Sequence, residues 1–589
     1  LPGPLIEAQE GDTIRITITN KNEIMATTVH WHGLHQRGTV WNDGTSQITQ
    51  CSLSPFESQT YEFIAYPAGT HYWHSHQGMT ATDGIAGPIV IHPKVPEPFY
   101  EELNLSVDDV EEQMLFLMDY FDDTSLQREA GLASESLNWI GNPASLLLNG
   151  KGLSKYCTNF TGQQPFSKYS CSDTLQWTPS ILVEQGKTYR FRVVNGGGLV
   201  MQNLAINQHN MTIVEVDGTN VVPYTVQNLT IAPGQRYSVI VYADQGENDD
   251  DGEENFWMQS LVAGRPLSNM PEGNWVLSYA NSTANVQLPN VNQKKPTHPV
   301  YDVDQTQVFT AFFENLHTTG EEEVDNITTT TRGTCQVVWT LNNISFVYPD
   351  SGSPLIYSAV EESQRLGWPL PGPLSVAGDS VPGDDDDTTP PGYYIQQQAT
   401  SVIRLNEGDV AEFVIENSVG IEGTSEFHPW HFHGHSFWVV GRGIGTYNET
   451  QDVPNYNLVN PVLRDTTVGL KNSWVAIRFI ANNPGVWYLH CHIESHLTMG
   501  MGFVVIVSPN KIGSLTDSVQ YCSANDLQSP FQSNIVNSSM DDTTTIAAAD
   551  ESEAASAGNN NDAGYNAAAG IIATTMAAVV IVTSMMSYL

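Results

Sequence analysis

The chain has little positive charge. It contains 23 Lys and Arg residues against 65 Asp and Glu among 589 residues, which gives a formal net charge of −42 at pH 7. A surface this acidic repels phosphate groups, so nucleic acids and anionic membrane surfaces are disfavoured as partners. We interpret the acidity as a solvated surface suited to a salty medium. The alternative is a field that gathers cations such as metal ions.

Long segments with helical periodicity are also rare. Short segments alternate apolar and polar residues instead, as in GDTIRITITN at 11–20, and Gly and Pro lie between them. A period of two is the signature of half-buried strands. We therefore predict an all-β fold of sandwich domains. Because 589 residues are too many for one ordinary core, we expect about three domains.

The predicted domains cover residues 1–96, 110–285 and 306–530. An acidic connector joins the first two, and a polar connector joins the second to the third. RLNEGDVAEFVIEN at 404–417 repeats the pattern of EAQEGDTIRITITN at 7–20, which supports repeated sandwich units. The Pro- and Asp-rich run at 382–392 is interpreted as a solvated loop.

The two ends of the chain lack packing signals. No Met or leader opens the sequence, so we expect a leader that is removed or missing, and a first strand missing with it is an alternative. Residues 531–566 are small and polar and predict a disordered stalk. Residues 567–589 are uncharged and apolar enough to span a bilayer. Ser556, Ala557 and Gly558 match a GPI-attachment signal, which we favour over a permanent membrane helix. The chain is then extracellular or at the cell surface, and only this tail contacts the membrane.

Histidines occur in pairs of the form His-x-His. Because alternate residues of a strand share a face, each pair presents two imidazoles side by side. Eight imidazoles suit a cluster of three copper ions, with two on one ion and three on each of the others. One pair is expected by chance, but four pairs are not. The pairs are His30 and His32, His74 and His76, His431 and His433, and His490 and His492.

The last pair encloses Cys491 in the segment HCHIESHLTMGM, which follows an apolar run that predicts a strand. The Cys491 side chain is therefore expected to point away from the two flanking imidazoles. His496 and Met501 follow in the same loop, and HPWHFHGH offers His428. Two His, one Cys and a distant axial Met are the ligands of a blue copper site. One short strand can thus join two metal centres and conduct electrons between them.

These motifs resemble those of the multicopper oxidase family, and most of all those of its ascorbate oxidases. The resemblance covers about residues 1–525 and is carried by HWHGLHQRGTVWNDGT, HPWHFHGHSFWVVGRG, NNPGVWYLHCHIESHLTMGMG and WIGNPASLLLNGKG. It implies three cupredoxin-like Greek-key domains, of which the middle one binds no copper. It also implies four copper ions that couple oxidation of a small reducing substrate to reduction of dioxygen to water.

The resemblance also implies a role for each copper ligand. His428, Cys491, His496 and axial Met501 match the type 1 site, and His30 and His431 match type 2 copper. One type 3 copper is matched by His76, His433 and His490, and the other by His32, His74 and His492.

Other residues are assigned by the same resemblance. Asp43 and Glu494 match acidic residues thought to relay protons, and a structural role for Glu494 is the alternative. Trp139 and Trp339 match the tryptophans that line the substrate pocket beside His496, where an ascorbate-like enediol would stack. Both could instead be core residues.

Three other functions compete with ascorbate oxidation. These are laccase-like oxidation of phenols, ferroxidase activity at the cell surface, and a non-catalytic relative without copper. Ferroxidases in the family usually carry acidic residues next to the type 1 histidines. Glu426, two residues before His428, gives the iron hypothesis only weak support.

The remaining histidines and the cysteines are assigned next. His209 is predicted to be structural, and His35, His71, His92 and His435 to support the ligands or lie at the surface. The resemblance implies disulfides Cys51–Cys522 and Cys157–Cys171 and a free, buried Cys335. Seven glycosylation sequons agree with an extracytoplasmic chain: Asn104, Asn159, Asn210, Asn228, Asn326, Asn343 and Asn448.

Overall fold

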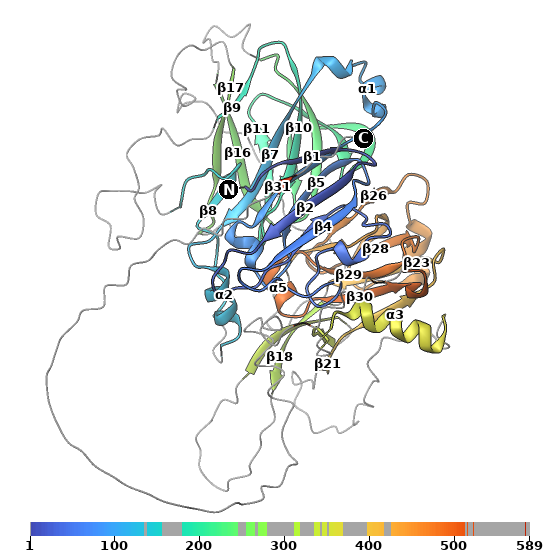
Figure 1. Cartoon of the computed structure of the whole chain (residues 1–589). Coiled ribbons are helices and arrows are strands. Elements are labelled where there is room, and N and C mark those ends of the chain that lie inside the picture. The colour runs from blue at the N-terminus through green and yellow to red at the C-terminus, as the bar shows by residue number, and fades with distance from the viewer. Residues whose placement is uncertain are drawn as a thin grey trace, which may run out of the picture.

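Strands predominate in the computed structural model of the chain, which confirms the predicted all-β class (Figure 1). The structure describes residues 2–134, 138–155, 180–245, 255–265, 269–279, 311–317, 335–341, 344–349, 353–368, 397–417, 426–512, 515, 522 and 583–584. The strands form seven sheets among these residues, in three successive groups along the chain.

The first group has one sheet in the order β1-β6-β5-β3, and β2 pairs with β4 and β31 in another. Strand β2 shows why the sequence alternates, because Ile14, Ile16 and Ile18 are buried and the residues between them are more exposed. The strands are β1 Ile6–Gln9, β2 Thr13–Thr19, β3 Val29–His32, β4 Ser58–Ile64, β5 Gly69–Ser75, β6 Ala86–His92 and β31 Thr583–Ser584.

The middle group has two sheets in the orders β13-β12-β15-β10-β7-β8 and β14-β11-β16-β17-β9. Their facing sides share a core that contains Trp275 and Phe256. The strands are β7 Val110–Tyr120, β8 Ser145–Leu148, β9 Ser180–Val183, β10 Thr188–Asn195, β11 Met201–Ile206, β12 Met211–Val216, β13 Thr219–Val226, β14 Asn228–Ile231, β15 Arg236–Tyr242, β16 Asn255–Ala263 and β17 Gly273–Tyr279.

The third group has sheets in the orders β22-β30-β29-β24-β27, β23-β28-β25-β26 and β18-β19-β20-β21. Trp430 and Trp487 fill the core of the first of these. The strands are β18 Ala311–His317, β19 Cys335–Leu341, β20 Ile344–Phe346, β21 Gln397–Ala399, β22 Val402–Leu405, β23 Val410–Asn417, β24 His428–Phe432, β25 Phe437–Ile444, β26 Val462–Arg464, β27 Thr466–Gly469, β28 Ser473–Ile480, β29 Gly485–Cys491 and β30 Gly502–Val507.

The helices are short and lie in the connections. A capping box between Thr124 and Gln127 fixes the start of α2. The α-helices are α1 Pro98–Glu102, α2 Ser125–Leu132, α3 Leu355–Leu366, α4 Glu449–Asp452 and α5 Glu494–Thr498, and the 3-10 helices are η1 Val40–Asn42, η2 Thr80–Asp83, η3 Val107–Asp109, η5 Val453–Asn455 and η6 Pro509–Lys511.

Buried charged side chains of the middle group bind the other two groups. The Glu215 carboxylate accepts from the backbone N–H of Thr70 at 2.6 Å, and Arg236 forms two 2.6 Å bonds with Asp465. In Figure 1 the blue strands of the first group lie between the green and the orange strands of the others. The middle group thus contacts both of the groups that carry paired histidines.

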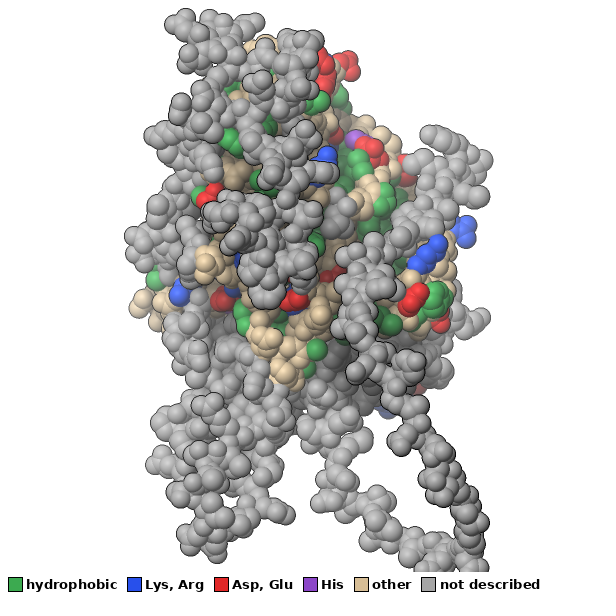
Figure 2. Space-filling view, turned by 90° about the vertical axis from the view of Figure 1, so that its left-hand side faces the viewer, with side chains coloured by type: hydrophobic (Ala, Val, Ile, Leu, Met, Phe, Trp, Pro, Cys, Tyr) green, Lys and Arg blue, Asp and Glu red, His purple; other side chains and the backbone are tan. Residues whose placement is uncertain are grey.

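The predicted disulfide Cys51–Cys522 is present, with a Cα–Cα distance of 5.2 Å. Cys157, Cys171 and the side chain of Cys335 lie outside the described residues, as do the stalk 531–566 and all of the tail 567–589 except β31. In the described part of the chain, no helix is both long and apolar enough to cross a bilayer. Where Figure 2 shows described residues, acidic and basic side chains both appear on the surface.

Candidate copper centres

Strand β29 ends in the His-Cys-His motif and lies inside its sheet, between β24 and β30. Its pairing with β24 places His431 opposite His490 and Trp430 opposite Cys491. All seven residues of β29 are buried. The motif is therefore fixed on both sides by backbone hydrogen bonds and shielded from water.

The Cys491 thiol lies against two imidazoles, which we call the sulfur group: His428, Cys491 and His496. Cys491 Sγ is 3.6 Å from His428 Nδ1 and 3.7 Å from His496 Nδ1, and these two nitrogens are 3.1 Å apart. The turn into α5 brings His496 back beside the strand. Met501 is buried, and its backbone bonds to the backbones of both Cys491 and His496.

The eight paired histidines meet in a second group, which we call the imidazole cluster: His30, His32, His74, His76, His431, His433, His490 and His492. His490 Nε2 is 3.0 Å from His433 Nε2 and 3.3 Å from His76 Nε2.

On the other side of the imidazole cluster, His492 Nε2 is 3.2 Å from His32 Nδ1. His431 Nε2 is 3.4 Å from His30 Nε2. Histidines in β3, β5, β24 and β29, together with those that directly follow the last three strands, thus bring their ring nitrogens to one place.

The chemistry of both groups fits a bound cation. Burial lowers the pKa of His74, His76 and His490 well below the usual value, so the rings are neutral at pH 7. The buried Nε2 of His74 has no hydrogen-bond partner among the described residues, an arrangement that a metal ion would satisfy. Burial also raises the pKa of the Cys491 thiol, which a coordinating metal would counteract. Imidazole and thiolate together are ligands that suit copper.

Asp43 supports one side of the imidazole cluster. Its Oδ2 is 2.8 Å from His433 Nδ1, and its backbone carbonyl accepts from His30 Nδ1 at 2.8 Å. Burial alone would raise the pKa of Asp43, but His433 and His30 hold it well below its usual range. The turn requires Gly44, which has φ of 86°, because a Cβ there would lie 1.8 Å from the carbonyl oxygen of Val29.

Glu494 lies at the start of α5 and is buried. Burial, with Glu129 and Asp119 nearby, raises the pKa of Glu494 to about 8. Its backbone N–H donates to Gly198 of the middle group at 3.0 Å. The carboxyl group is therefore protonated at neutral pH and can donate a proton.

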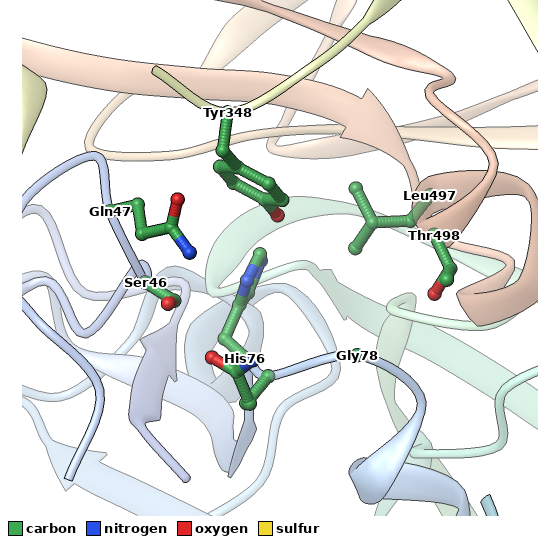
Figure 3. Close-up of a pocket in the computed structure, with 8 residues that line it drawn as sticks. Ser46, Gln47, His76, Gly78, Tyr348, Leu497 and Thr498 are labelled. Carbon is green, nitrogen blue, oxygen red and sulfur yellow. The ribbon is translucent and has the colours of Figure 1, made fainter. Parts of the chain in front are cut away.

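A pocket opens beside His76. Figure 3 shows the His76 ring below Tyr348, with Gln47 and Ser46 on one side and Leu497 and Thr498 on the other. The lining residues come from the first group, from the segment after β20 and from α5. The pocket therefore lies where these three parts of the chain meet, with His76 of the imidazole cluster in its wall.

A different set of residues surrounds His496. The Trp139 ring lies 6.0 Å from the His496 ring, with 39° between their planes. Glu426 Oε2 is 3.3 Å from His496 Nε2 and forms an ion pair with Arg265. Although burial would raise it, Arg265 and His496 lower the pKa of Glu426 to about 2. The backbone of Trp339 lies in β19, and its side chain is outside the described residues.

Comparison with known proteins identifies the family. Models of the multicopper oxidase family match residues 1–96, 111–281 and 372–511. The L-ascorbate oxidase of Cucumis sativus is 34% identical over 549 residues, which cover 89% of this chain and 87% of that protein. This chain belongs to the multicopper oxidase family. Laccase-1 of Cryptococcus neoformans var. grubii is 32% identical over 87% of this chain and 77% of its own length.

Solved multicopper oxidases share the fold. The laccase of Botrytis aclada matches with a TM-score of 0.65 and 24% identity, over 87% of this chain and 83% of that one. Fet3p, a multicopper oxidase that functions in iron import, matches with a TM-score of 0.58 and 24% identity, over 90% and 88%. These matches confirm the cupredoxin-like fold of this multicopper oxidase.

Five further histidines in the described part of this multicopper oxidase have ordinary protein contacts. His209 bonds to the carbonyl of Asn207 and the hydroxyl of Tyr279, in agreement with a structural role. His71 and His435 contact the backbone carbonyls of Pro67 and His433, and His35 contacts Ser436. His92 is partly exposed and lies 3.2 Å from Glu7.

Sequence reasoning missed several residues around the predicted copper ligands of this multicopper oxidase. The Tyr72 hydroxyl lies 2.8 Å from His492 Nε2, and its position between two histidines in HYWHSH was the only signal. No sequence signal marked Arg265, Asp465 or Thr466, because only folding brings them beside the predicted ligands.

Proposed function

We propose that this chain is a four-copper oxidase that takes electrons one at a time from a small reducing substrate and transfers them to dioxygen, giving water. The arrangement of three consecutive residues at the end of β29 supports this proposal most. Cys491 belongs to the sulfur group, whereas its neighbours His490 and His492 belong to the imidazole cluster. Family membership supports copper and oxidase chemistry.

The ligand assignment follows the two groups. The sulfur group and axial Met501 bind type 1 copper, and His30 and His431 bind type 2 copper. His76, His433 and His490 bind one type 3 copper, and His32, His74 and His492 bind the other. Three cupredoxin-like domains, 1–96, 110–285 and 306–530, hold these ions, and the middle one contributes no ligand.

When bound, copper supplies the one-electron oxidation and reduction that the side chains lack. The chain provides the path, since Cys491 is covalently linked to both of its histidine neighbours. Burial of the ligands excludes water from the path. Asp43 orients the His30 and His433 rings, and a carboxyl proton on Glu494 is available for water formation. We assign the pocket beside His76 as the passage for dioxygen.

The favoured substrate is an ascorbate-like enediol. A flat ring can stack on Trp139, whose ring lies beside that of the buried His496. Trp339 is predicted to complete the pocket. The identity to L-ascorbate oxidases agrees with this choice.

Iron and phenols are the alternative substrates. Glu426 beside His496 favours Fe²⁺, because carboxylates bind hard cations. The ion pair with Arg265 argues against it, since the guanidinium already neutralises this carboxylate. The identity to Laccase-1 keeps phenol oxidation open. We place the enzyme outside the cell. The pairing of β31, within the tail 567–589, with β2 of the first group gives no support to the predicted membrane contact of this tail.

The test is a comparison of steady-state rates with ascorbate, Fe²⁺ and a phenol. We expect ascorbate to be the best substrate, and we expect Trp139→Ala and Trp339→Ala each to lower kcat/KM for ascorbate by about tenfold, as for loss of one stacking contact. Trp438→Ala is the control, because Trp438 packs in a separate cluster with Trp474. Negligible ascorbate turnover, or equal effects in all three variants, would contradict the assignment.

A further inference from the structure

The first residue of β27, Thr466, and the residue before it, Asp465, contact two histidines of the imidazole cluster. Thr466 Oγ1 lies 3.1 Å from His431 Nδ1 and 3.2 Å from His32 Nε2. The backbone carbonyl of Asp465 lies 3.1 Å from the same His431 nitrogen. Thr466 is fully buried, so no water competes for these contacts.

The direction of each hydrogen bond can be deduced. Thr466 Oγ1 is 2.8 Å from Asp465 Oδ1, and a carboxylate oxygen only accepts, so the hydroxyl proton lies on this bond. The hydroxyl oxygen can then only accept from His431 and His32. His431 Nδ1 must also donate to the Asp465 carbonyl. Both facing nitrogens, His431 Nδ1 and His32 Nε2, therefore carry the ring proton.

The opposite nitrogens are left with their lone pairs. His431 Nε2 points to His30 Nε2 at 3.4 Å, and His32 Nδ1 points to His492 Nε2 at 3.2 Å. Two neighbouring imidazoles thus present different nitrogens to the cluster, and one hydroxyl selects both. A neutral ring binds a metal only through its unprotonated nitrogen.

The middle group fixes the carboxylate that orients this hydroxyl. Arg236 binds both oxygens of Asp465 at 2.6 Å and also donates to the carbonyls of Thr70 and Gly234. Gln235 donates to the Thr466 carbonyl at 3.1 Å. Arg236 is fully buried and has no alternative position in water.

We propose that Thr466, oriented by Asp465 and Arg236, is a positioning residue that selects the metal-binding nitrogens of His431 and His32. The middle domain then supplies no copper ligand but determines the ligand geometry of the cluster. This inference rests on the proposed function, because it takes the imidazole cluster to be a copper site.

The test is Thr466→Val on the full chain, which keeps the shape and removes the hydroxyl. We expect copper at the imidazole cluster to dissociate at about 10- to 100-fold lower concentration of a competing chelator. The type 2 signal in the electron paramagnetic resonance spectrum should change, while type 1 absorption stays as in the wild type. Thr466→Ser should restore both properties, because it returns the hydroxyl.

Thr467→Val is the matched control. Thr467 is the next residue of β27, is equally buried, and its hydroxyl accepts from Arg442 at 2.8 Å rather than contacting a histidine. Unchanged copper affinity and type 2 signal in Thr466→Val would overturn the proposal, and so would equal loss of type 1 and cluster copper. A wild-type protein without cluster copper would instead refute the proposed function.

Discussion

At the scale of the residue, burial sets the protonation of the sulfur group, and only its thiol differs from the state that a metal requires. Burial raises the pKa of the Cys491 thiol, and it lowers the pKa of His428 and His496. The imidazoles are thus ready to bind a metal, whereas the thiol must lose its proton when the metal arrives. Copper loading of this group should therefore release protons.

Met501 gives a prediction at this scale. The axial ligand tunes the potential of a type 1 site, and a thioether stabilises the oxidised ion more than an alkyl group does. We expect Met501→Leu to raise the type 1 potential by about 60 mV or more, which is at least tenfold in a one-electron equilibrium. Redox titration of the blue absorption measures it. Met499→Leu is the control, because Met499 is also buried two residues away. An unchanged potential in Met501→Leu would count against the axial role.

At the scale of the element, β5 carries a ligand pair and is anchored at Thr70 by buried charges of the middle group. Glu215 accepts from the Thr70 N–H at 2.6 Å and from Arg190 at 2.5 Å. Burial alone would raise the pKa of Glu215, but Arg190 and Arg192 lower it to about 2. These buried charges fix β5, which contains His74 and ends directly before His76.

Replacing Glu215 by Gln should therefore destabilise the chain. Two buried guanidinium groups, those of Arg190 and Arg192, each lose one of their charge partners, so we expect the free energy of unfolding at pH 7 to fall by roughly 3 kcal/mol. The contribution of the Glu215 carboxylate is complete above the unfolded pKa of 4.5 and is lost as the pH falls toward about 2. The difference between wild type and variant should therefore be smaller at pH 3 than at pH 7.

Denaturant unfolding at the two pH values measures this difference. Glu111→Gln removes a carboxylate from an exposed ion pair with Lys187 and should cost less than about 1 kcal/mol. If the Glu215 variant loses as little stability as this control, or loses the same amount at both pH values, the buried charges around Glu215 do not stabilise β5.

At the scale of the whole molecule, the disulfide joins Cys51 in the first group to Cys522 after the last β-strand of the third, a separation of 471 residues. A cross-link that closes so long a loop reduces the number of conformations open to the unfolded chain. It thereby ties together the two groups whose histidines form the cluster.

The double variant Cys51→Ser, Cys522→Ser should lose about 2–4 kcal/mol of stability. Its thermal midpoint should fall by several degrees in calorimetry. A reducing agent should lower the midpoint of the wild type more than that of the variant. Equal thermal midpoints for the wild type and the double variant would mean that the disulfide does not reduce the conformations of the unfolded chain.

The sequence predicted the molecule well where chemistry is local. The alternation of 11–20 indicated strands, and the spacing of Cys491 and its neighbours indicated two groups of ligands. It could not reveal contacts such as Arg236 with Asp465, which lie 229 residues apart. An arginine in β15 and an aspartate after β26 have no local pattern that links them. Their partnership arises only when the middle group packs against the third.

The most direct test is to count copper in the wild type and in Cys491→Ser. We predict four copper ions per wild-type chain with blue absorption, and three in the variant, with the blue colour lost and the type 2 resonance retained. That result requires the sulfur group and the imidazole cluster to be separate sites joined by one strand. A variant that keeps its blue colour, or a wild type that binds no copper, would contradict the account.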